Sequence, residues 1–350
     1  MIMLADKNYC MSSFLTLRYI EDKTKCFASN IVYNHPILEQ SEEKILVYTS
    51  EDIDKEIGSQ IDNLKKENKR IGILLSGGMD SAILASYLSG CDAYTFRFEE
   101  SNLQDEELKR AEYFAKYYKL DLHYVDISWE SINANLSKVM KCKGGPVHSI
   151  EPQIFQAAMQ AKEDKIDIII IGDASDYIFY GMDKILSRDW RYEEFRERCT
   201  YVEPKEVLIN PIDMNYLFER YRKGEDGIDF LRFFDTIITE ESYGSYQNAF
   251  KAAKMNFLDP YEILKMACDV DLYRIRNGES KYLIRELFRK KYPIKEPEKN
   301  PMPRMVDLYF ENWNGPTREE FKKNIEMSKY TGNQKWLLYC LERFLNENEL

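Results

Sequence analysis

The sequence predicts an α/β protein: a parallel sheet with helices on both faces, a helical C-terminal region and a small N-terminal β appendage. From residue 71 onward, strand-like and helix-like segments alternate, which is typical of a parallel sheet with helical crossovers. The segment 166–171, Ile-Asp-Ile-Ile-Ile-Ile, is almost continuously apolar. Strands of that kind are typical of a sheet buried on both faces. Both observations favour the same doubly covered sheet.

The elements follow from apolar periodicity and from turn residues, taken in chain order. Residues 1–50 alternate in a strand-like way around 14–20 and 26–28, with another short strand at 44–48, so we expect a separate β-rich unit there. Ser50 precedes a helical stretch that runs to about residue 68. We expect strands near 71–75, 92–98, 121–126 and 166–171, and helices near 81–89, 104–118, 130–140 and 151–163. Residues 51–350 are predicted to form one domain, with its sheet core at about 70–184 and a helical part at about 185–350.

Composition excludes several classes of function. The net charge is −11 and the pI is near 5.1, so the chain as a whole has no attraction for nucleic acid or for anionic membranes. The seven cysteines are scattered and form no CxxC pair, which fits reduced thiols in a cytoplasmic protein. No apolar run approaches the length of a membrane span. We therefore expect a cytoplasmic protein with no nucleic-acid or membrane partner, and its oligomeric state is left open.

The most informative segment is Ser76-Gly77-Gly78-Met79-Asp80-Ser81, between a buried strand and a helix. Its glycines allow a tight turn with outward-facing backbone N–H groups, and its serines add hydroxyl donors. Such a junction suits an anion, phosphate above all. Asp80 makes chemical sense there if a divalent cation lies between its carboxylate and the phosphates. A tight turn that is merely capped by Ser81 explains the same residues structurally.

The loop resembles the SGGxDS pyrophosphate loop of the N-type ATP pyrophosphatases, and its surroundings resemble the asparagine synthetase branch. The resemblance implies the adenine nucleotide alpha hydrolase-like fold, with ATP and Mg²⁺ as cofactors and with cleavage of ATP between the α and β phosphates. It places Ser76, Gly77, Gly78, Asp80 and Ser81 at the nucleotide. The segment Tyr-Thr-Phe-Arg-Phe-Glu at 94–99 resembles the family's second strand, so Phe96 is expected at the adenine.

A second motif, Gly-Asp-Ala-Ser-Asp at 172–176, follows the fourth predicted strand. A capped helix start would explain it structurally. It is similar to the GEGSDELFGG motif of asparagine synthetases, and the similarity implies that Asp176 binds metal together with Asp80. Gly172 then lines the pocket of the reaction intermediate. Asp173 matches the family's glutamate as a catalytic residue and candidate base, but aspartate is one methylene shorter.

A third piece comprises 257–259, Phe-Leu-Asp, and the helix that begins near Ser280. It looks like the family's PFLD segment and its KxxLR helix, which gives Lys281 a catalytic role at the α and β phosphates. A lysine in the first turn of a helix opposes the helix dipole unless an anion lies there, and this favours function over a solvated surface lysine. Arg285 could face the same site or pair with a neighbouring carboxylate.

These resemblances imply an AMP-forming carbon–nitrogen ligase that adenylates a carboxylate and transfers the acyl group to ammonia or an amine. The sequence departs from the glutamine-dependent enzymes, since Ile2 follows Met1 and only about 50 residues precede the synthetase-like region. We expect a small-molecule or peptide carboxylate as substrate. The nitrogen donor is expected to be ammonia, free or delivered by a separate glutaminase, or an amine. The family's ExRVPFLD reads Ala-Ala-Lys-Met-Asn-Phe-Leu-Asp at 252–259, which puts aspartate as the acceptor in doubt. Two alternatives are a tRNA-modifying enzyme with this loop and a non-catalytic nucleotide-binding protein.

Overall fold

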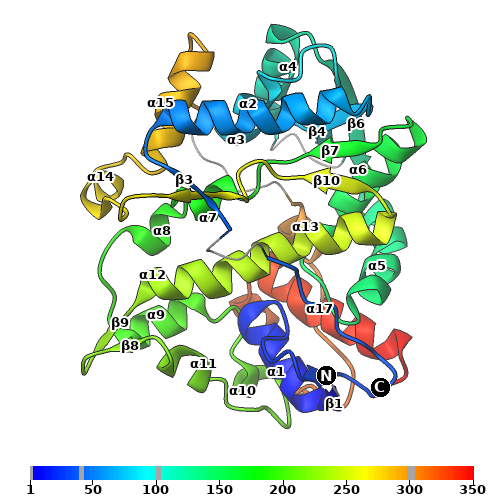
Figure 1. Ribbon diagram of the computed structural model, residues 1–350. Coiled ribbons are helices and arrows are strands. Elements are labelled where there is room, and N and C mark those ends of the chain that lie inside the picture. The colour runs from blue at the N-terminus through cyan, green and yellow to red at the C-terminus, as the bar shows by residue number, and fades with distance from the viewer. Residues whose placement is uncertain (1–2, 39–42, 100–103, 298–303) are drawn as a thin grey trace.

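The computed structural model describes residues 3–38, 43–99, 104–297 and 304–350, and its centre is a five-stranded parallel sheet (Figure 1). The strands are β4 (Ile71–Leu74), β5 (Asp92–Phe98), β6 (Asp121–Ile127), β7 (Ile168–Ile170) and β10 (Asn256–Leu258). Their spatial order is β10-β7-β4-β5-β6, so the chain builds outward from β4 in one direction and then in the other. In sheets of this kind ligands bind beyond the carboxyl ends of the strands, where the order reverses. Here that point lies between β4 and β7.

Helices cover both faces of the sheet, which confirms the predicted fold class (Figure 1). One layer consists of α2 (Ser50–Lys66), α3 (Met79–Ala85), α4 (Asp105–Tyr117) and α15 (Tyr282–Lys291). The other consists of α5 (Trp129–Lys143), α6 (Glu151–Glu163) and α13 (Thr239–Ala253). The central β-strand residues Ile73, Ile169 and Ile170 are fully buried between these layers. The predicted β5 matches the observed strand, and the other predicted strands and helices of residues 51–171 agree within a few residues.

The N-terminal segment differs from the prediction. The strand expected at 14–20 is wrong, because Lys7–Leu17 forms the helix α1, capped by the Asp6 carboxylate, which accepts from the Tyr9 amide at 3.0 Å. Among the described residues of this segment the strands are short: β1 (Leu4–Ala5) pairs with β2 (Lys25–Cys26), and β3 (Ile45–Val47) follows. Every residue from Tyr9 to Leu17 is buried. A β-rich unit over residues 1–50 is therefore not what this segment forms; the domain boundary at residue 50 stays a prediction.

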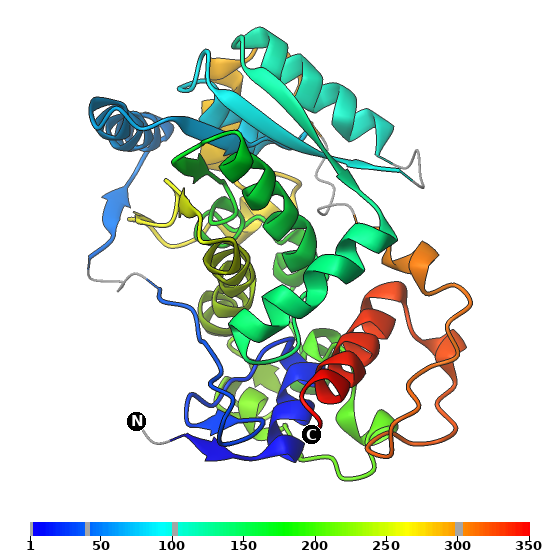
Figure 2. The ribbon, with the colours of Figure 1, turned by 90° about the vertical axis from the view of Figure 1, so that its right-hand side faces the viewer.

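The helix α1 packs against two elements of the C-terminal half, α10 (Pro204–Val207) and α17 (Gly332–Glu347). Figure 2 shows α1 beside α17, at the opposite end of the molecule from the sheet. The N-terminal segment thus contributes to the core under the helical part of the chain. This placement brings Arg18, at the C-terminal end of α1, toward residues from much later in the sequence.

The C-terminal half is mainly helical, as predicted, but it also supplies a strand of the central sheet. The edge strand β10 pairs with β7 in the register Leu258↔Ile170, so the sheet extends beyond the range 70–184 expected for it. The other elements are α7 (Ser175–Ile178), α8 (Asp183–Leu186), α9 (Tyr192–Cys199), α11 (Tyr216–Glu219), β8 (Arg222–Lys223), β9 (Gly227–Ile228), α12 (Phe230–Phe233), a π-helical turn (Phe234–Ile238), β11 (Leu264–Met266), α14 (Leu272–Arg276), α16 (Val306–Tyr309) and a 3₁₀ turn (Met327–Lys329). None of the helices in the described residues is long and apolar enough to cross a membrane.

Candidate active site

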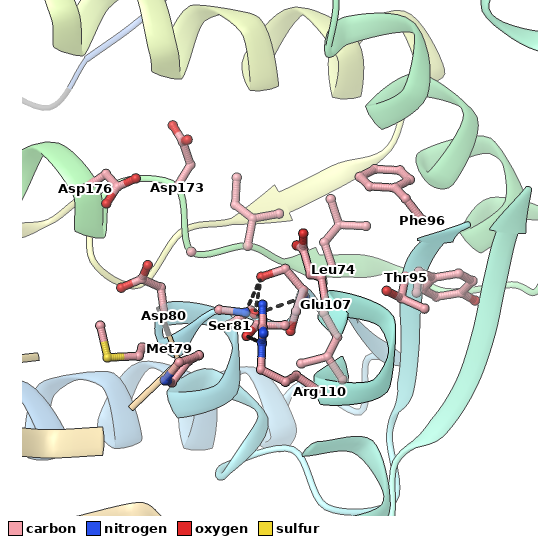
Figure 3. Close-up of a pocket in the computed structure, with 18 of the residues that line it drawn as sticks. Leu74, Met79, Asp80, Ser81, Thr95, Phe96, Glu107, Arg110, Asp173 and Asp176 are labelled. Atoms are coloured by element: carbon pink, nitrogen blue, oxygen red, sulfur yellow. Dashed lines mark hydrogen bonds between the residues drawn. The ribbon is translucent and has the colours of Figure 1, made fainter. Parts of the chain in front are cut away.

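A pocket opens at the carboxyl ends of β4, β5 and β7, where the strand order reverses (Figure 3). The residues that the sequence singled out come from four separate segments, and all of them line this pocket. They are Ser76, Gly77, Gly78, Asp80, Ser81, Phe96, Gly172, Asp173, Asp176 and Lys281. The predicted constellation is therefore a single site in the folded chain. Their individual roles stay predictions.

The loop between β4 and α3 is closed by hydrogen bonds between its two serines. The Ser76 amide donates to Ser81 Oγ at 3.0 Å, and the two hydroxyl oxygens lie 2.9 Å apart. The Gly78 amide donates to Ser76 Oγ at 3.1 Å. Gly77 packs directly on α4, and a Cβ atom there would lie 2.5 Å from the carbonyl oxygen of Glu107. This loop needs glycine at 77 for close packing of its backbone.

Lys281 joins the two carboxylates that the sequence predicted as metal ligands. Its Nζ donates to Asp80 Oδ2 at 2.6 Å and lies 2.5 Å from Asp176 Oδ1. The other oxygen of Asp80 accepts from Ser175 Oγ at 2.6 Å. Figure 3 shows both carboxylates on the same side of the pocket, Asp80 from α3 and Asp176 from α7. Carboxylate oxygens from the segments that follow β4 and β7 thus converge on the Lys281 ammonium group.

The backbone position of Lys281 differs from the one expected from the sequence. Lys281 is the N-cap residue that precedes α15, with a left-handed φ of 53°, and does not lie within the first helical turn. Its side chain is 4% exposed. Burial opposes its charge, but Asp176 and Asp80 outweigh that effect and raise the pKa of Lys281 to about 12. In this structure, two carboxylates account for the buried ammonium group.

Residue 181 must be glycine because the Lys281–Asp176 ion pair fills the space that a side chain would need. A Cβ atom at residue 181 would lie 2.3 Å from Asp176 Oδ1 and 2.3 Å from the Cε atom of Lys281. A Cβ atom does not come that close to non-bonded heavy atoms, so any larger residue at 181 would displace the Lys281–Asp176 ion pair. The preceding residue, Tyr180, has a left-handed φ of 57°. The tight turn after α7 therefore fixes the geometry of the ion pair.

Asp173 lies in the same pocket and has a different environment. Its two carboxylate oxygens accept from Ser242 Oγ on α13, at 3.2 and 3.0 Å. Burial first, and then the neighbouring Asp176 carboxylate, raise the pKa of Asp173 to about 7. A carboxyl group with a pKa near neutrality can exchange a proton under physiological conditions. Ser242, which the sequence analysis missed, carries no signal of its role in its local sequence.

A layer of buried groups holds the loop after β7 in place. Asp259, from the segment after β10, accepts from the Ala174 amide at 2.7 Å and from the Tyr261 amide at 3.1 Å. The Tyr261 hydroxyl donates to the carbonyl oxygen of Asp80 at 3.0 Å. Asp259 and Tyr261 thereby connect the two strand ends that carry Asp80 and Asp176. The sequence predicted Asp259 as part of a motif and as a possible partner of Arg285, whose Nε instead donates to the Ser280 carbonyl oxygen.

The other end of the pocket is formed by β5 and α4. Phe96 and Thr95 line it from β5, and Glu107 and Arg110 line it from α4 (Figure 3). Arg110 Nε donates to the carbonyl oxygen of Gly77 at 3.0 Å. Burial raises the pKa of Glu107. Glu107 and Arg110 were missed by the sequence analysis, because surface-like charges in a helix look like ordinary solvated residues.

The asparagine synthase family model matches residues 53–233, which is more than half of the chain. The chain belongs to the asparagine synthase family. The matched range contains the loop at 76–81 and the motif at 172–176, whereas Lys281 lies beyond it. Family membership, together with the pocket, supports an ATP-using enzyme with a pyrophosphate loop. No curated protein matches the sequence.

Three solved structures show loose overall similarity to this chain. A U34-tRNA thiolase from Methanococcus maripaludis has 14% identity and a TM-score of 0.31, covering 70% of this chain and 80% of that chain. An NMN synthetase from Francisella tularensis has 12% identity and a TM-score of 0.30, and the match covers 73% of this chain and 99% of that chain. An NAD⁺ synthetase from Burkholderia pseudomallei has 10% identity and a TM-score of 0.26, and the match covers 71% of this chain and 89% of that chain.

Proposed function

We propose that this protein is an ATP-dependent amide-forming ligase. It adenylates a substrate carboxylate with release of pyrophosphate and passes the acyl group to ammonia or an amine with release of AMP. The observation that carries the proposal is the convergence of Asp80, Asp176 and Lys281 beside Asp173, at one end of a pocket whose other end reaches Phe96. The groups proposed to bind phosphate and a titratable carboxyl group thus lie together. This arrangement suits a reaction at the α phosphate.

The loop at 76–81 is the site proposed for the leaving pyrophosphate. The Ser76 and Gly78 amides and the two serine hydroxyls hydrogen-bond within the loop, which holds its backbone and hydroxyl groups in a fixed arrangement. Preorganised donors stabilise charge that develops on a leaving group without reorganising during the reaction. Arg110, which contacts the Gly77 carbonyl, adds a positive charge beside this loop. The loop therefore supplies charge stabilisation where pyrophosphate forms.

Asp80 and Asp176 fit a Mg²⁺ ion because both offer carboxylate oxygens at one position and both already bind a cationic group there. A bound Mg²⁺ would neutralise phosphate charge and orient the phosphates. The ammonium group of Lys281 competes for the same oxygens. If the carboxylates held a metal ion, Lys281 would be free to pair with phosphate oxygens.

The proposed reaction has two steps. A carboxylate oxygen of the substrate attacks the α phosphorus, the bond from that phosphorus to the bridging oxygen breaks, and pyrophosphate leaves with the electron pair. Ammonia or an amine then attacks the acyl carbon, and AMP leaves as the amide forms. Asp173 accepts the proton lost by the nitrogen, consistent with its pKa of about 7 and its hydrogen bonds to Ser242. Holding both reactants in one pocket lowers the entropic cost of each step.

The test is a product analysis with Mg-ATP, a panel of carboxylates, and ammonium or simple amines. We expect AMP and pyrophosphate in equal amounts, dependent on the carboxylate. The variant Asp80→Asn is the matched control, because it keeps the size of the side chain and removes the negative charge. Formation of ADP and inorganic phosphate only would overturn the mechanism. ATP binding without turnover across the whole panel would favour a non-catalytic role.

A further inference from the structure

The turn after α7 contains a backbone conformation that is unusual for its residue. Tyr180 has a φ of 57°, which lies in the left-handed region. For a residue with a large side chain this conformation is an outlier, because the Cβ atom crowds the backbone, whereas glycine adopts it freely. Such strain persists only where the surrounding structure holds the residue in place. The contacts of the Tyr180 side chain therefore indicate what the conformation serves.

The Tyr180 side chain is held by the π-helical turn Phe234–Ile238. Its half-buried ring stacks on the fully buried ring of Phe234, with the ring centroids 5.6 Å apart and an angle of 26° between the ring planes. Burial first, and then the Asp235 carboxylate, raise the pKa of the Tyr180 hydroxyl, so that it stays protonated and can donate to Asp235. Two successive residues of the π-helical turn thus contact one tyrosine.

The helix that contains this π-helical turn also carries residues of the pocket. The helix α12, the π-helical turn and α13 follow one another without interruption over residues 230–253, and Figure 1 shows α12 and α13 in one continuous helix. Ser242 on α13 donates to Asp173, and Tyr246 lines the pocket. A π-helical turn within an α-helix is frequent at functional sites. Tyr180 therefore connects the turn after α7 to the helix that holds Asp173.

The next residue, Gly181, places the same turn against the Lys281–Asp176 ion pair. The Gly181 amide donates to the carbonyl oxygen of Asp176 at 2.8 Å, and the ion pair fills the space beside its Cα atom. Tyr180 also interacts electrostatically with Tyr282, the residue that follows Lys281. A change in the backbone at residue 180 would therefore move the turn relative to both members of the ion pair.

We infer that Tyr180 is a positioning residue, which anchors the turn after α7 to the π-helical turn and so holds the Lys281–Asp176 ion pair in place. The inference rests on the proposed function for the role of Asp176 as a Mg²⁺ ligand. Stacking on Phe234 and the contact with Asp235 offset the cost of the left-handed backbone. Glycine would adopt the same backbone at no cost, but it would leave the turn without an anchor.

The first experiment measures the accessibility of Lys281 in the full-length protein and needs neither metal nor substrate. Lysine side chains are acylated with an N-hydroxysuccinimide ester, and mass spectrometry follows the rate at each lysine in the wild type, Tyr180→Ala and Tyr180→Gly. The side chain of Lys281 is 4% exposed. We expect its labelling to become about threefold to tenfold faster in both variants, as for the loss of an aromatic contact from a local opening equilibrium. Lys290, whose side chain is 46% exposed, is the internal control and should not change.

The two variants also separate the anchor from general stability. Both lack the ring, but alanine keeps the strained backbone, so Tyr180→Gly should have a higher melting temperature than Tyr180→Ala. Labelling of Lys281 should nevertheless be fast in both. Tyr180→Phe keeps the stacking on Phe234 and loses the contact with Asp235, and it should give a smaller increase. It also serves as the test if the smaller side chains prevent folding.

The second experiment measures the stabilisation of the folded protein by Mg²⁺ in thermal unfolding without ATP. We expect the Mg²⁺ concentration that gives half of the effect to rise about threefold to tenfold in Tyr180→Ala and Tyr180→Gly, by the same loss of an aromatic contact. Lys119→Gly is the matched control, because Lys119 is exposed and has the same φ of 57°, and it should leave both measurements unchanged.

Unchanged labelling of Lys281 in all three Tyr180 variants would overturn the inference. Labelling as slow as in the wild type in Tyr180→Gly alone would also overturn it, because the backbone conformation would then protect Lys281 without the side chain. Faster labelling in a protein whose wild type shows no response to Mg²⁺ would support the anchor and count against the proposed metal site alone.

Discussion

Replacing Lys281 with methionine tests how the ion pairs at the candidate active site affect stability without metal and the response to Mg²⁺. The side chain of Lys281 is 4% exposed and contacts Asp80 at 2.6 Å and Asp176 at 2.5 Å. Methionine has a similar length and no charge. Its introduction leaves two carboxylates converging on one position without the cation between them. We expect lower stability in the absence of metal and a stronger response to Mg²⁺.

The magnitude follows from the burial of the three groups. Removing one partner of a buried ion pair costs about 3–5 kcal/mol, because the remaining charge stays desolvated. The side chains of Asp80 and Asp176 are 24% and 33% exposed, so water relieves part of that penalty. We therefore expect a loss of about 3 kcal/mol, the lower end of the range, in the free energy of unfolding. Binding of Mg²⁺ to the folded state alone restores stability in proportion to the logarithm of its concentration.

The assay is urea unfolding with and without Mg²⁺, in the absence of ATP. Lys290→Met, on the exposed side of α15, is the matched control and should change stability little, because its side chain is 46% exposed. The double variant Lys281→Met with Asp176→Asn removes one of the two facing carboxylate charges and should recover part of the loss. A single variant as stable as the wild type, with no larger response to Mg²⁺, would refute the reasoning about these carboxylates.

Three further predictions concern activity. Asp80→Asn should reduce pyrophosphate release at least a hundredfold, which is about 2.7 kcal/mol of transition-state stabilisation, while circular dichroism stays that of the wild type. The base proposed at Asp173 works only when ionised, so kcat/KM should rise with pH through about 7, the pKa of that group. Asp173→Asn should abolish the rise, and a flat wild-type profile contradicts the assignment. Gly181→Ala should lower activity and stability together, because its Cβ would lie 2.3 Å from both Asp176 and Lys281, and unchanged kinetics would show that the turn relaxes at no cost.

Most of the sheet was predictable because its strands and helices carry separate local signals. The strand β5 and the helix α6 were predicted over the residues that form them. The helix α1 was mistaken for a strand because residues Tyr9–Leu17 are all buried, which removes the polar face that normally reveals a helical period. The strand β10 is only three residues long, so its place in the sheet depends on pairing with β7.

By itself, the sequence determined which residues meet at the pocket, since turn chemistry and motif order placed Asp80, Asp173 and Asp176 at strand ends. The ends of parallel strands on one edge of a sheet are necessarily close together. Only the tertiary structure decided what surrounds them. Lys281 pairs with carboxylates from two other segments, and Arg18 reaches His148, 130 positions along the chain. Such contacts depend on helix packing between distant segments, and no local pattern in the sequence records them.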